Sequence, residues 1–147
     1  MDALSAALSI KAPRDEVFAF FSNFEVSSKH LHGAVKTEFH SVMRTGLGAE
    51  WTEHDDGPDG VVVSRIKVVA FDQPHSYTLN TENADSYETM VFRFTDCGTE
   101  TLVAFELTMK PKGILRKIFV GLGKRVIFDM MKEDLKRIRD EIESCQG

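Results

Sequence analysis

The last third of the sequence constrains the fold most, because it has the pattern of one long amphipathic helix. Pro111 and Gly113 end the segment before it, and apolar residues then recur every three or four positions. These apolar residues are Leu115, Ile118, Phe119, Leu122, Val126, Met130, Leu135, Ile138 and Ile142. A helix of ~30 residues is ~45 Å long. We therefore expect it to lie across a broad surface that the earlier part of the chain supplies.

The chain before this helix changes to a two-residue period at about residue 35. Residues 3–11 predict a strand, with a short helix as the alternative, and two short helices follow over 12–22 and 24–31. Turns then separate six predicted strands, at 35–43, 49–54, 61–71, 77–81, 87–95 and 101–110. Short connections favour antiparallel neighbours, and a sheet of about seven such strands curls. We expect a cup, closed on its open side by the long helix and at one end by the short helices.

Composition and charge narrow the class of protein. A length of 147 residues with 42% hydrophobic content suits a single domain over 1–147 with a real core. The net charge of −5 argues against nucleic-acid binding, which usually needs a basic surface. The basic residues between 110 and 125 predict a solvated helix face, or alternatively a contact with lipid headgroups. Eleven Phe residues suit a large apolar interior or the lining of an apolar pocket.

Cysteine, histidine and hydropathy patterns predict no disulfide, metal or membrane segment. Cys97 and Cys145 lie far apart without CxxC spacing. His30 and His32 read as ordinary loop or surface histidines, with a metal site as the alternative only if they share a strand face. The N-terminus lacks the features of a signal peptide, and no run approaches the ~18 apolar residues of a membrane span. We expect a cytoplasmic protein without a cofactor.

Four short motifs, in their order and spacing, resemble the START-related helix-grip superfamily, also called SRPBCC or polyketide-cyclase-like. They are Ala12-Pro13 before the segment 17–22, the turn Gly46-x-Gly48, Asp72-Gln73-Pro74 before Tyr77, and the ending 135–141. The resemblance covers nearly the whole chain. It implies an α+β fold in which a curved seven-stranded antiparallel sheet wraps around the C-terminal helix, with two short helices after the first strand.

Two departures from this pattern bear on the ligand. Such proteins often carry a Trp in the region that corresponds to 29–33, where this chain has none, and many have Thr where Ala49 follows Gly48. Both departures fall near the expected mouth of the cavity. The identity of a ligand therefore does not carry over from the superfamily.

Three functional hypotheses remain open, because fold alone does not choose among them. The first is binding of a small hydrophobic ligand, lipid-, polyketide- or aromatic-like, by a monomer or homodimer. The second is a polyketide cyclase/dehydratase-type or hydrolase-type enzyme that uses the same cavity. The third is a protein-interaction module, such as a co-chaperone or toxin–antitoxin partner, that uses the convex sheet face. The sequence has no P-loop, HExxH or GxSxG motif that would single out an enzyme class.

The strand pattern also predicts which side chains meet a ligand, if the more apolar face of each strand points inward. The predicted ligand-binding residues are Trp51, Glu53, Arg65, Tyr77, Leu79, Met90, Phe92, Phe105, Phe119, Leu122 and Val126. Plain core packing is the alternative for the apolar members. The register of 61–71 is ambiguous, because Val61, Val63 and Val69 share a side with Arg65. Arg65 faces the cavity only if that side turns inward.

Glu53, Arg65 and Tyr77 are the candidates for chemistry. Opposite charges on inward faces of adjacent strands are costly unless they pair or meet a polar group of a ligand. In an enzyme, Glu53 would be the general base, with Arg65 or Tyr77 stabilising an enolate. The alternative is that Glu53 and Arg65 pair at the rim or face water. Gly121 and Gly123 predict close packing or a kink in the helix, or alternatively room for a ligand.

Overall fold

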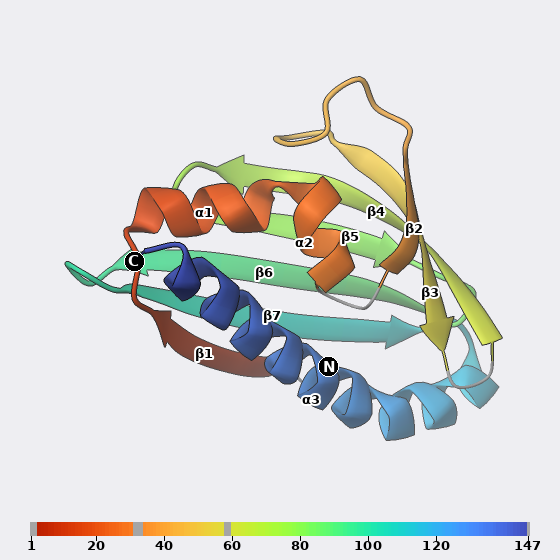
Figure 1. Cartoon of the computed structure of the whole chain (residues 1–147). Helices are drawn as coiled ribbons and strands as arrows, with labels where there is room; N and C mark the ends of the chain where they lie inside the picture. Colours follow the sequence, from red (N-terminus) through yellow and green to blue (C-terminus); the bar gives the residue numbers. More distant parts are fainter. Residues whose placement is uncertain (1–2, 31–33, 58–59, 147) are drawn as a thin grey trace.

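The computed structural model describes residues 3–30, 34–57 and 60–146, and the side chains of 34, 57 and 114–124 lie outside the described part. Figure 1 shows the elements in chain order. They are β1 (Leu4–Ile10), α1 (Arg14–Ser22), α2 (Phe24–His30), β2 (Ala34–Phe39), β3 (Glu50–Gly57), β4 (Gly60–Asp72), β5 (Ser76–Glu82), β6 (Ser86–Asp96), β7 (Thr101–Pro111) and α3 (Ile114–Ser144). This order confirms the predicted helix-grip fold.

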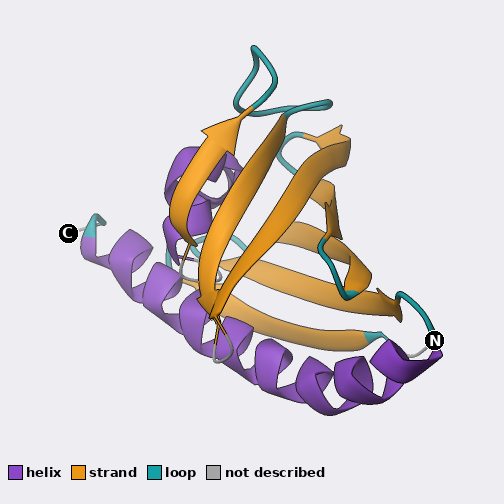
Figure 2. Ribbon diagram, turned by 90° about the vertical axis from the view of Figure 1, so that its right-hand side faces the viewer, coloured by secondary structure: helices purple, strands orange, loops and turns teal. Residues whose placement is uncertain are grey.

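The seven strands form one antiparallel sheet in the order β1-β7-β6-β5-β4-β3-β2. Strands β2 to β7 follow one another as a meander, and β1 joins at the far edge by pairing with β7, with Leu4 opposite Leu107. Figure 2 shows the sheet curling strongly, with α3 running along its open side. The long helix packs on β7 and β1, as a helix that closes a cup must. Among the described residues, no helix combines the length and apolar character needed to cross a membrane.

The connection between β2 and β3 depends on two glycines with left-handed backbone. Gly46 and Gly48 have φ of 86° and 88°, a conformation that other residues rarely adopt. The Gly48 amide donates to the Val68 carbonyl across 3.0 Å, and the Val68 amide donates to the Ala49 carbonyl across 2.9 Å. The turn thereby holds the start of β3 against β4. The β3–β4 hairpin is longer than predicted, because Asp55 and Asp56 belong to β3 rather than to the turn.

The strand registers settle which side chains point into the cup. The predicted inward residues of β3, β5, β6 and β7 are buried: Ala49, Trp51, Glu53, Tyr77, Leu79, Thr81, Met90, Phe92, Phe94, Val103, Phe105, Leu107 and Met109. On β4 the inward residues are Ser64, Ile66 and Val68, so the ambiguous side that carries Arg65 faces outward. Two-residue alternation fixes this choice for residues 64–68, and a β-bulge between Val68 and Ala70 then shifts the register so that Phe71 packs against the core.

An aromatic cluster fills the end of the cup beneath α1 and α2. The Phe18 ring meets Phe71, Tyr77 and Phe94 edge-on at centroid distances of 5.3, 6.0 and 5.1 Å. The Phe24 ring stacks on Trp51 at 4.9 Å. Such pairs contribute beyond the burial of their area. The high Phe content therefore fills the interior.

The described inner face of α3 differs from the predicted stripe. Its buried apolar residues are Phe128, Met131, Leu135, Ile138 and Ile142, spaced three and four apart. The Phe128 ring stacks on Phe105 of β7 at 5.6 Å. Val126 and Met130 were predicted on this stripe but are each 59% exposed, because their positions on the helix fall outside the arc that the buried residues define.

Candidate functional site

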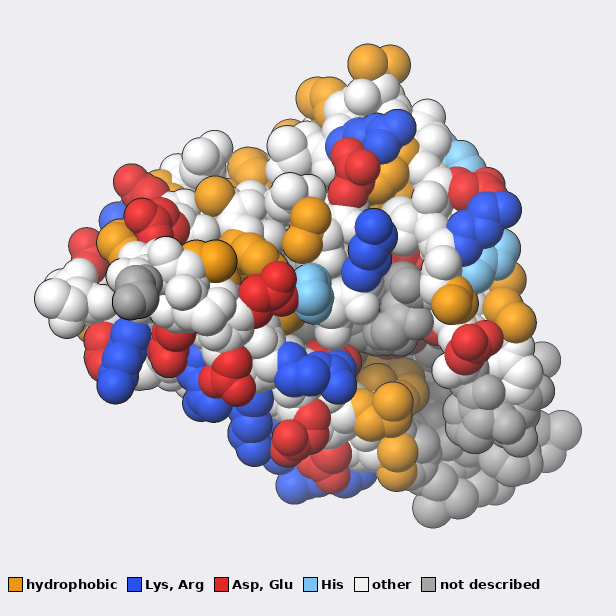
Figure 3. All heavy atoms as spheres, in the orientation of Figure 1, with side chains coloured by type: hydrophobic (Ala, Val, Ile, Leu, Met, Phe, Trp, Pro, Cys, Tyr) orange, Lys and Arg blue, Asp and Glu red, His pale blue; other side chains and the backbone are white. Residues whose placement is uncertain are grey.

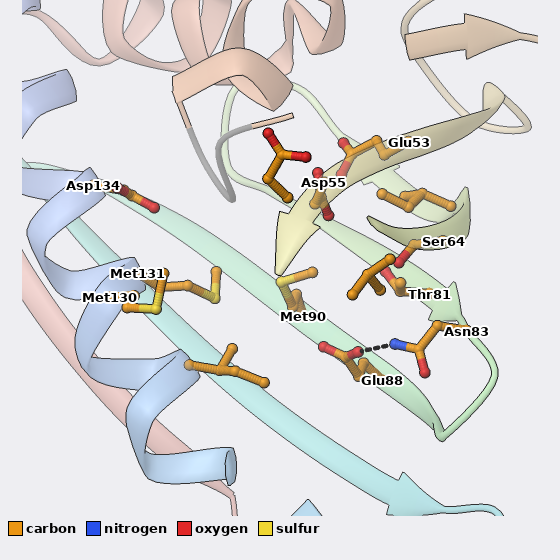
Figure 4. A pocket seen from close by; sticks show the side chains of 14 residues that line it. Glu53, Asp55, Ser64, Thr81, Asn83, Glu88, Met90, Met130, Met131 and Asp134 are labelled. Atoms are coloured by element: carbon orange, nitrogen blue, oxygen red, sulfur yellow. Dashed lines mark hydrogen bonds between the residues drawn. The ribbon is translucent and has the colours of Figure 1, made fainter. Parts of the chain in front are cut away.

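A cavity lies between the sheet and α3, at the end of the cup away from the aromatic cluster (Figure 4). Its volume is about 210 Å³. One water needs only about 15 Å³ on the same measure, so the space admits an organic molecule. Its described lining comes from β3, β4, β5, β6, α3 and the turn between β5 and β6: Glu53, Asp55, Asp56, Val62, Ser64, Ile66, Thr81, Asn83, Glu88, Met90, Ile127, Met130, Met131 and Asp134.

The sequence explains why space remains at this end. The described lining contains no Phe, Tyr or Trp, whereas aromatic rings are frequent in the rest of the core. Ser64 on β4 and Thr81 on β5 are buried, inward-facing and short. Side chains of this size leave room beneath the helix where Phe would fill it. The cavity is therefore a consequence of small residues on two neighbouring strands.

Part of the mouth of the cavity is apolar. Val62 of β4 and Ile127 and Met130 of α3 line the cavity and are also 41%, 37% and 59% exposed. Figure 3 shows a hollow in this face of the molecule with hydrophobic side chains beside it. An exposed apolar rim around a cavity is typical of a site that admits an apolar molecule.

Glu53 is the one predicted catalytic candidate that the structure places in the cavity. Only 2% of its surface is exposed, and its Oε1 accepts a hydrogen bond from the Trp51 indole Nε1 across 3.0 Å. The two residues are both inward-facing on β3, which brings the indole N–H beside the carboxylate. Burial of a carboxylate requires such donors. The site therefore contains a fixed acceptor in a cavity that is lined by both apolar and polar side chains.

Most of the predicted ligand-binding residues belong to the core instead. Met90 lines the cavity together with Glu53. Trp51, Tyr77, Leu79, Phe92 and Phe105 are buried, but they are absent from the described lining. These five side chains therefore pack in the core, which was the alternative to a contact with the ligand. The side chains of Phe119 and Leu122, and the glycines 121 and 123, lie outside the described residues.

Two predicted site residues point away from the cavity. Arg65 lies on the outer face of β4, its side chain is 68% exposed, and its Nη2 is 3.2 Å from Oε1 of Glu50. Arg65 therefore does not face the cavity, and the open choice of register is decided for the outer side, because the neighbouring inward positions on β4 are Ser64 and Ile66. Val126 is 59% exposed and is not among the described residues that line the cavity.

Tyr77 is held in the aromatic core rather than at the cavity. Its hydroxyl donates to the Phe21 carbonyl across 3.4 Å, and its ring stacks on Phe92 at 5.0 Å. Burial raises the pKa of the Tyr77 phenol, because the charged phenolate would lose its hydration. The predicted role of Tyr77 in stabilising an enolate is not supported by this position.

The structure adds lining residues that the sequence analysis missed. Asp55 and Asp56 fall in the predicted turn after residue 54, but the hairpin is longer than predicted and both residues belong to β3. Glu88 follows the same alternation as Met90, so its position was available from strand parity alone. Asp134 directly precedes Leu135 of the α3 stripe and lies at the edge of the buried face.

The other predicted features have ordinary structural roles. His30 of α2 lies with Nε2 3.2 Å from Oε2 of Glu141, and His32 lies outside the described residues. Within the described part of the chain, no group of three His, Cys, Asp or Glu side chains could hold a metal ion. Lys112 donates to Glu82 across 2.7 Å, and this hydrogen bond lowers the pKa of the Glu82 carboxyl.

The convex face, on which the interaction hypothesis depended, mixes apolar and charged residues. On β4, Val61, Val63 and Val69 are exposed. Arg65 and Lys67 lie between them on the same side of the strand. Alternating charge of this kind breaks the strand's apolar surface into separate positions, which is unlike a contiguous docking patch.

Comparison with known proteins agrees with this architecture. The chain is similar to a START superfamily protein from Mycobacterium smegmatis, with a TM-score of 0.76 and 11% identity, over 95% of this chain and 98% of that one. It is similar to the Zhui aromatase/cyclase from Streptomyces sp. R1128, with a TM-score of 0.76 and 12% identity, over 97% and 93%. A conserved protein from Geobacillus kaustophilus gives a TM-score of 0.70 and 18% identity, over 97% and 96%.

These identities are low, so the structural likeness shows the fold alone. No curated protein matches the sequence significantly. The family model described as polyketide cyclase / dehydrase and lipid transport matches residues 1–143. The predicted resemblance to START-related helix-grip proteins is thereby confirmed, and the chain belongs to the polyketide cyclase / dehydrase and lipid transport family.

Proposed function

We propose that this protein binds a small hydrophobic molecule in the cavity between the sheet and α3. The observation that carries the proposal is a space of about 210 Å³ in an interior that is elsewhere filled by aromatic rings. Its apolar lining includes Ile66, Met90 and Met131, and exposed apolar side chains lie at its mouth as well. The family description, which names cyclases, dehydrases and lipid transport, supports a ligand of this kind.

The methionines favour a ligand with an irregular or flexible apolar body. Met90, Met130 and Met131 all line the cavity, from the sheet and from α3. Methionine is unbranched and polarisable, so it adapts to ligands of different shape. Burial of apolar ligand surface against these side chains supplies roughly 25 cal/mol per Å². Glu53 then provides a fixed polar contact that orients the bound molecule.

Binding is tested with the neutral fluorescent probe N-phenyl-1-naphthylamine and a variant that fills the cavity. We expect the probe to bind the wild-type protein and Ser64→Leu to weaken its binding by about tenfold or more. Ser9→Leu on the exposed outer side of β1 is the matched control and should bind like the wild type. Equal binding by both variants would show that the probe uses another site. Native mass spectrometry of the purified protein would separately reveal any co-purified small molecule.

A second candidate function, catalysis in the same cavity, is favoured by the buried carboxylate of Glu53. A carboxylate fixed by Trp51 in an apolar space is suited to remove a proton next to a carbonyl. The other two catalytic candidates, Arg65 and Tyr77, lie elsewhere, which places binding ahead of catalysis.

Proton exchange on a bound ketone discriminates between the two functions. If Glu53 is a general base, the wild-type protein should accelerate exchange of the α-protons of 2-octanone in deuterated water, and Glu53→Gln should abolish this exchange. Binding of 2-octanone without accelerated exchange would leave only the binding function.

A further inference from the structure

The ionisable groups that line the cavity are all acidic within the described part of the chain. Carboxyl groups come from β3 (Glu53, Asp55 and Asp56), β6 (Glu88) and α3 (Asp134). The chain has 18 Lys and Arg against 23 Asp and Glu, so composition alone does not explain a lining of one sign. In Figure 4 the carboxyl groups of Glu53, Asp55, Glu88 and Asp134 lie on different sides of the methionines.

A second observation points to a missing ligand group. Thr81 lines the cavity and is only 6% exposed, yet its Oγ1 hydroxyl has no hydrogen-bond partner among the described residues. A buried hydroxyl without a partner carries the cost of lost hydration. Thr81 is the direct cross-strand partner of Glu88 in the β5–β6 ladder. Side chains in such a pair stand about 5 Å apart, so one ligand group can reach both.

We propose that the ligand of this cavity carries a cationic nitrogen, such as a protonated amine, on its apolar body. This inference rests on the proposed binding function and specifies the ligand class. Carboxylates around a partly enclosed space repel one another, and a cation among them relieves that repulsion. An ammonium group donates up to three hydrogen bonds and therefore fits a lining of carboxylates and hydroxyls. The same lining disfavours ligands with a carboxylate or phosphate group.

The proposal does not require the carboxylates to be free of other contacts. Glu53 accepts from Trp51, and Glu88 accepts from Asn83 Nδ2 across 3.0 Å. Asp134 pairs with Arg137, which is itself 67% exposed. A carboxylate has about four acceptor positions, so a carboxylate that already has protein partners can still accept a hydrogen bond from a ligand. An organic cation suits the site better than a metal ion, because the described acidic groups do not converge into a set of metal ligands.

The test compares three probes of equal length: n-octylammonium, 1-octanol and octanoate. Binding is measured near neutral pH by calorimetry and by the fluorescence of Trp51, the single Trp of the chain. We expect the ammonium to bind about tenfold more tightly than the alcohol, and octanoate to bind most weakly. Added salt should reduce the preference, as for any charge-based contact.

Variants locate the source of the preference. Glu88→Gln and Thr81→Val should each reduce the preference for octylammonium over octanol several-fold. Glu106→Gln changes the net charge equally on the outer face of β7 and should leave the preference intact. Loss of the preference in Glu106→Gln to the same extent would overturn the proposal, because the effect would then come from net charge alone.

The possible outcomes separate this inference from the binding proposal. Equal binding of octylammonium and octanol, or tighter binding of octanoate, overturns the cationic ligand but leaves a hydrophobic site. Binding of N-phenyl-1-naphthylamine without binding of octylammonium has the same consequence. If neither that probe nor any of the three octyl compounds binds, both proposals fail.

Discussion

The Trp51 indole donates a hydrogen bond from Nε1 to Oε1 of Glu53 across 3.0 Å, with both side chains buried. Glu53 lines the cavity, and Trp51 packs behind it against the Phe24 ring. The contact therefore links the aromatic core, which holds the fold together, to the cavity, which is left open. A carboxylate that is positioned from the core in this way keeps its orientation whether or not a ligand is present.

Replacement of Trp51 by Phe should destabilise the fold by about 1–3 kcal/mol, because it removes a donor from a buried carboxylate and leaves a small void. Urea unfolding followed by circular dichroism measures this cost. In the Glu53→Gln background the same replacement should cost about 1 kcal/mol less, since the acceptor is then neutral. Costs that are equal in the two backgrounds would show that the indole acts through packing alone.

The fold was predictable from the sequence because two periodicities carry most of it. The strand alternation placed Trp51, Met90 and Phe105 inside correctly. Alternation alone did not choose the inner face of β4, because valines lie on both faces of the strand. Arg65 and Lys67 are the only clear guide to its outer side. The predicted apolar stripe of α3 includes Leu135 and Ile138, which are buried. It also includes Val126, which is exposed, since apolar residues also lie outside the buried arc of the helix.

The cavity itself was much less predictable than the fold. A cavity depends on which inward positions carry small side chains, and a pattern of large apolar residues does not distinguish a small inward residue such as Ser64. Aromatic residues on inward registers fill space rather than line it, as Tyr77 and Phe92 do. Glu88 obeys the same alternation as Met90 and was recoverable from the sequence. Asp55 was not, because its place depends on the length of the β3–β4 hairpin.

Variants of Met90 and Met130 should separate an effect on stability from an effect on ligand binding. Both line the cavity, but Met90 is 2% exposed and Met130 is 59% exposed. Met90→Ala should cost about 2–5 kcal/mol of unfolding free energy, whereas Met130→Ala should change it by less than about 0.5 kcal/mol. Met130→Ala should nevertheless weaken binding of N-phenyl-1-naphthylamine, because it removes apolar surface at the mouth. Calorimetry with this probe and urea unfolding measure the two effects, and unchanged binding in Met130→Ala would exclude the mouth from the ligand contact.

Tyr77 should make the protein sensitive to alkali. Burial raises the pKa of its phenol above the unfolded value of about 10. The neutral phenol is therefore favoured in the folded state, and this contribution to stability is complete below the unfolded pKa and is lost as pH rises above it. Tyr77→Phe should lose less stability than the wild type between about pH 8 and about pH 11. Urea midpoints at the two pH values measure the difference, and parallel losses in both proteins would assign the alkaline sensitivity to other groups.

Thr81 and Thr101 offer the sharpest test of the cavity as a site built for a ligand. Both are buried, but the Thr101 hydroxyl donates to the Ala12 carbonyl across 2.8 Å, whereas the Thr81 hydroxyl has no partner among the described residues. Thr101→Val should cost about 1–3 kcal/mol, because it leaves a buried carbonyl unpaired. Thr81→Val keeps the shape and removes an unsatisfied group, so the unliganded protein should be as stable as the wild type or more stable. Thermal and urea unfolding of the two variants give the comparison. A loss for Thr81→Val as large as that for Thr101→Val would mean that its hydroxyl supports the fold, whereas unchanged stability with weaker octylammonium binding would mean that it is retained for the ligand.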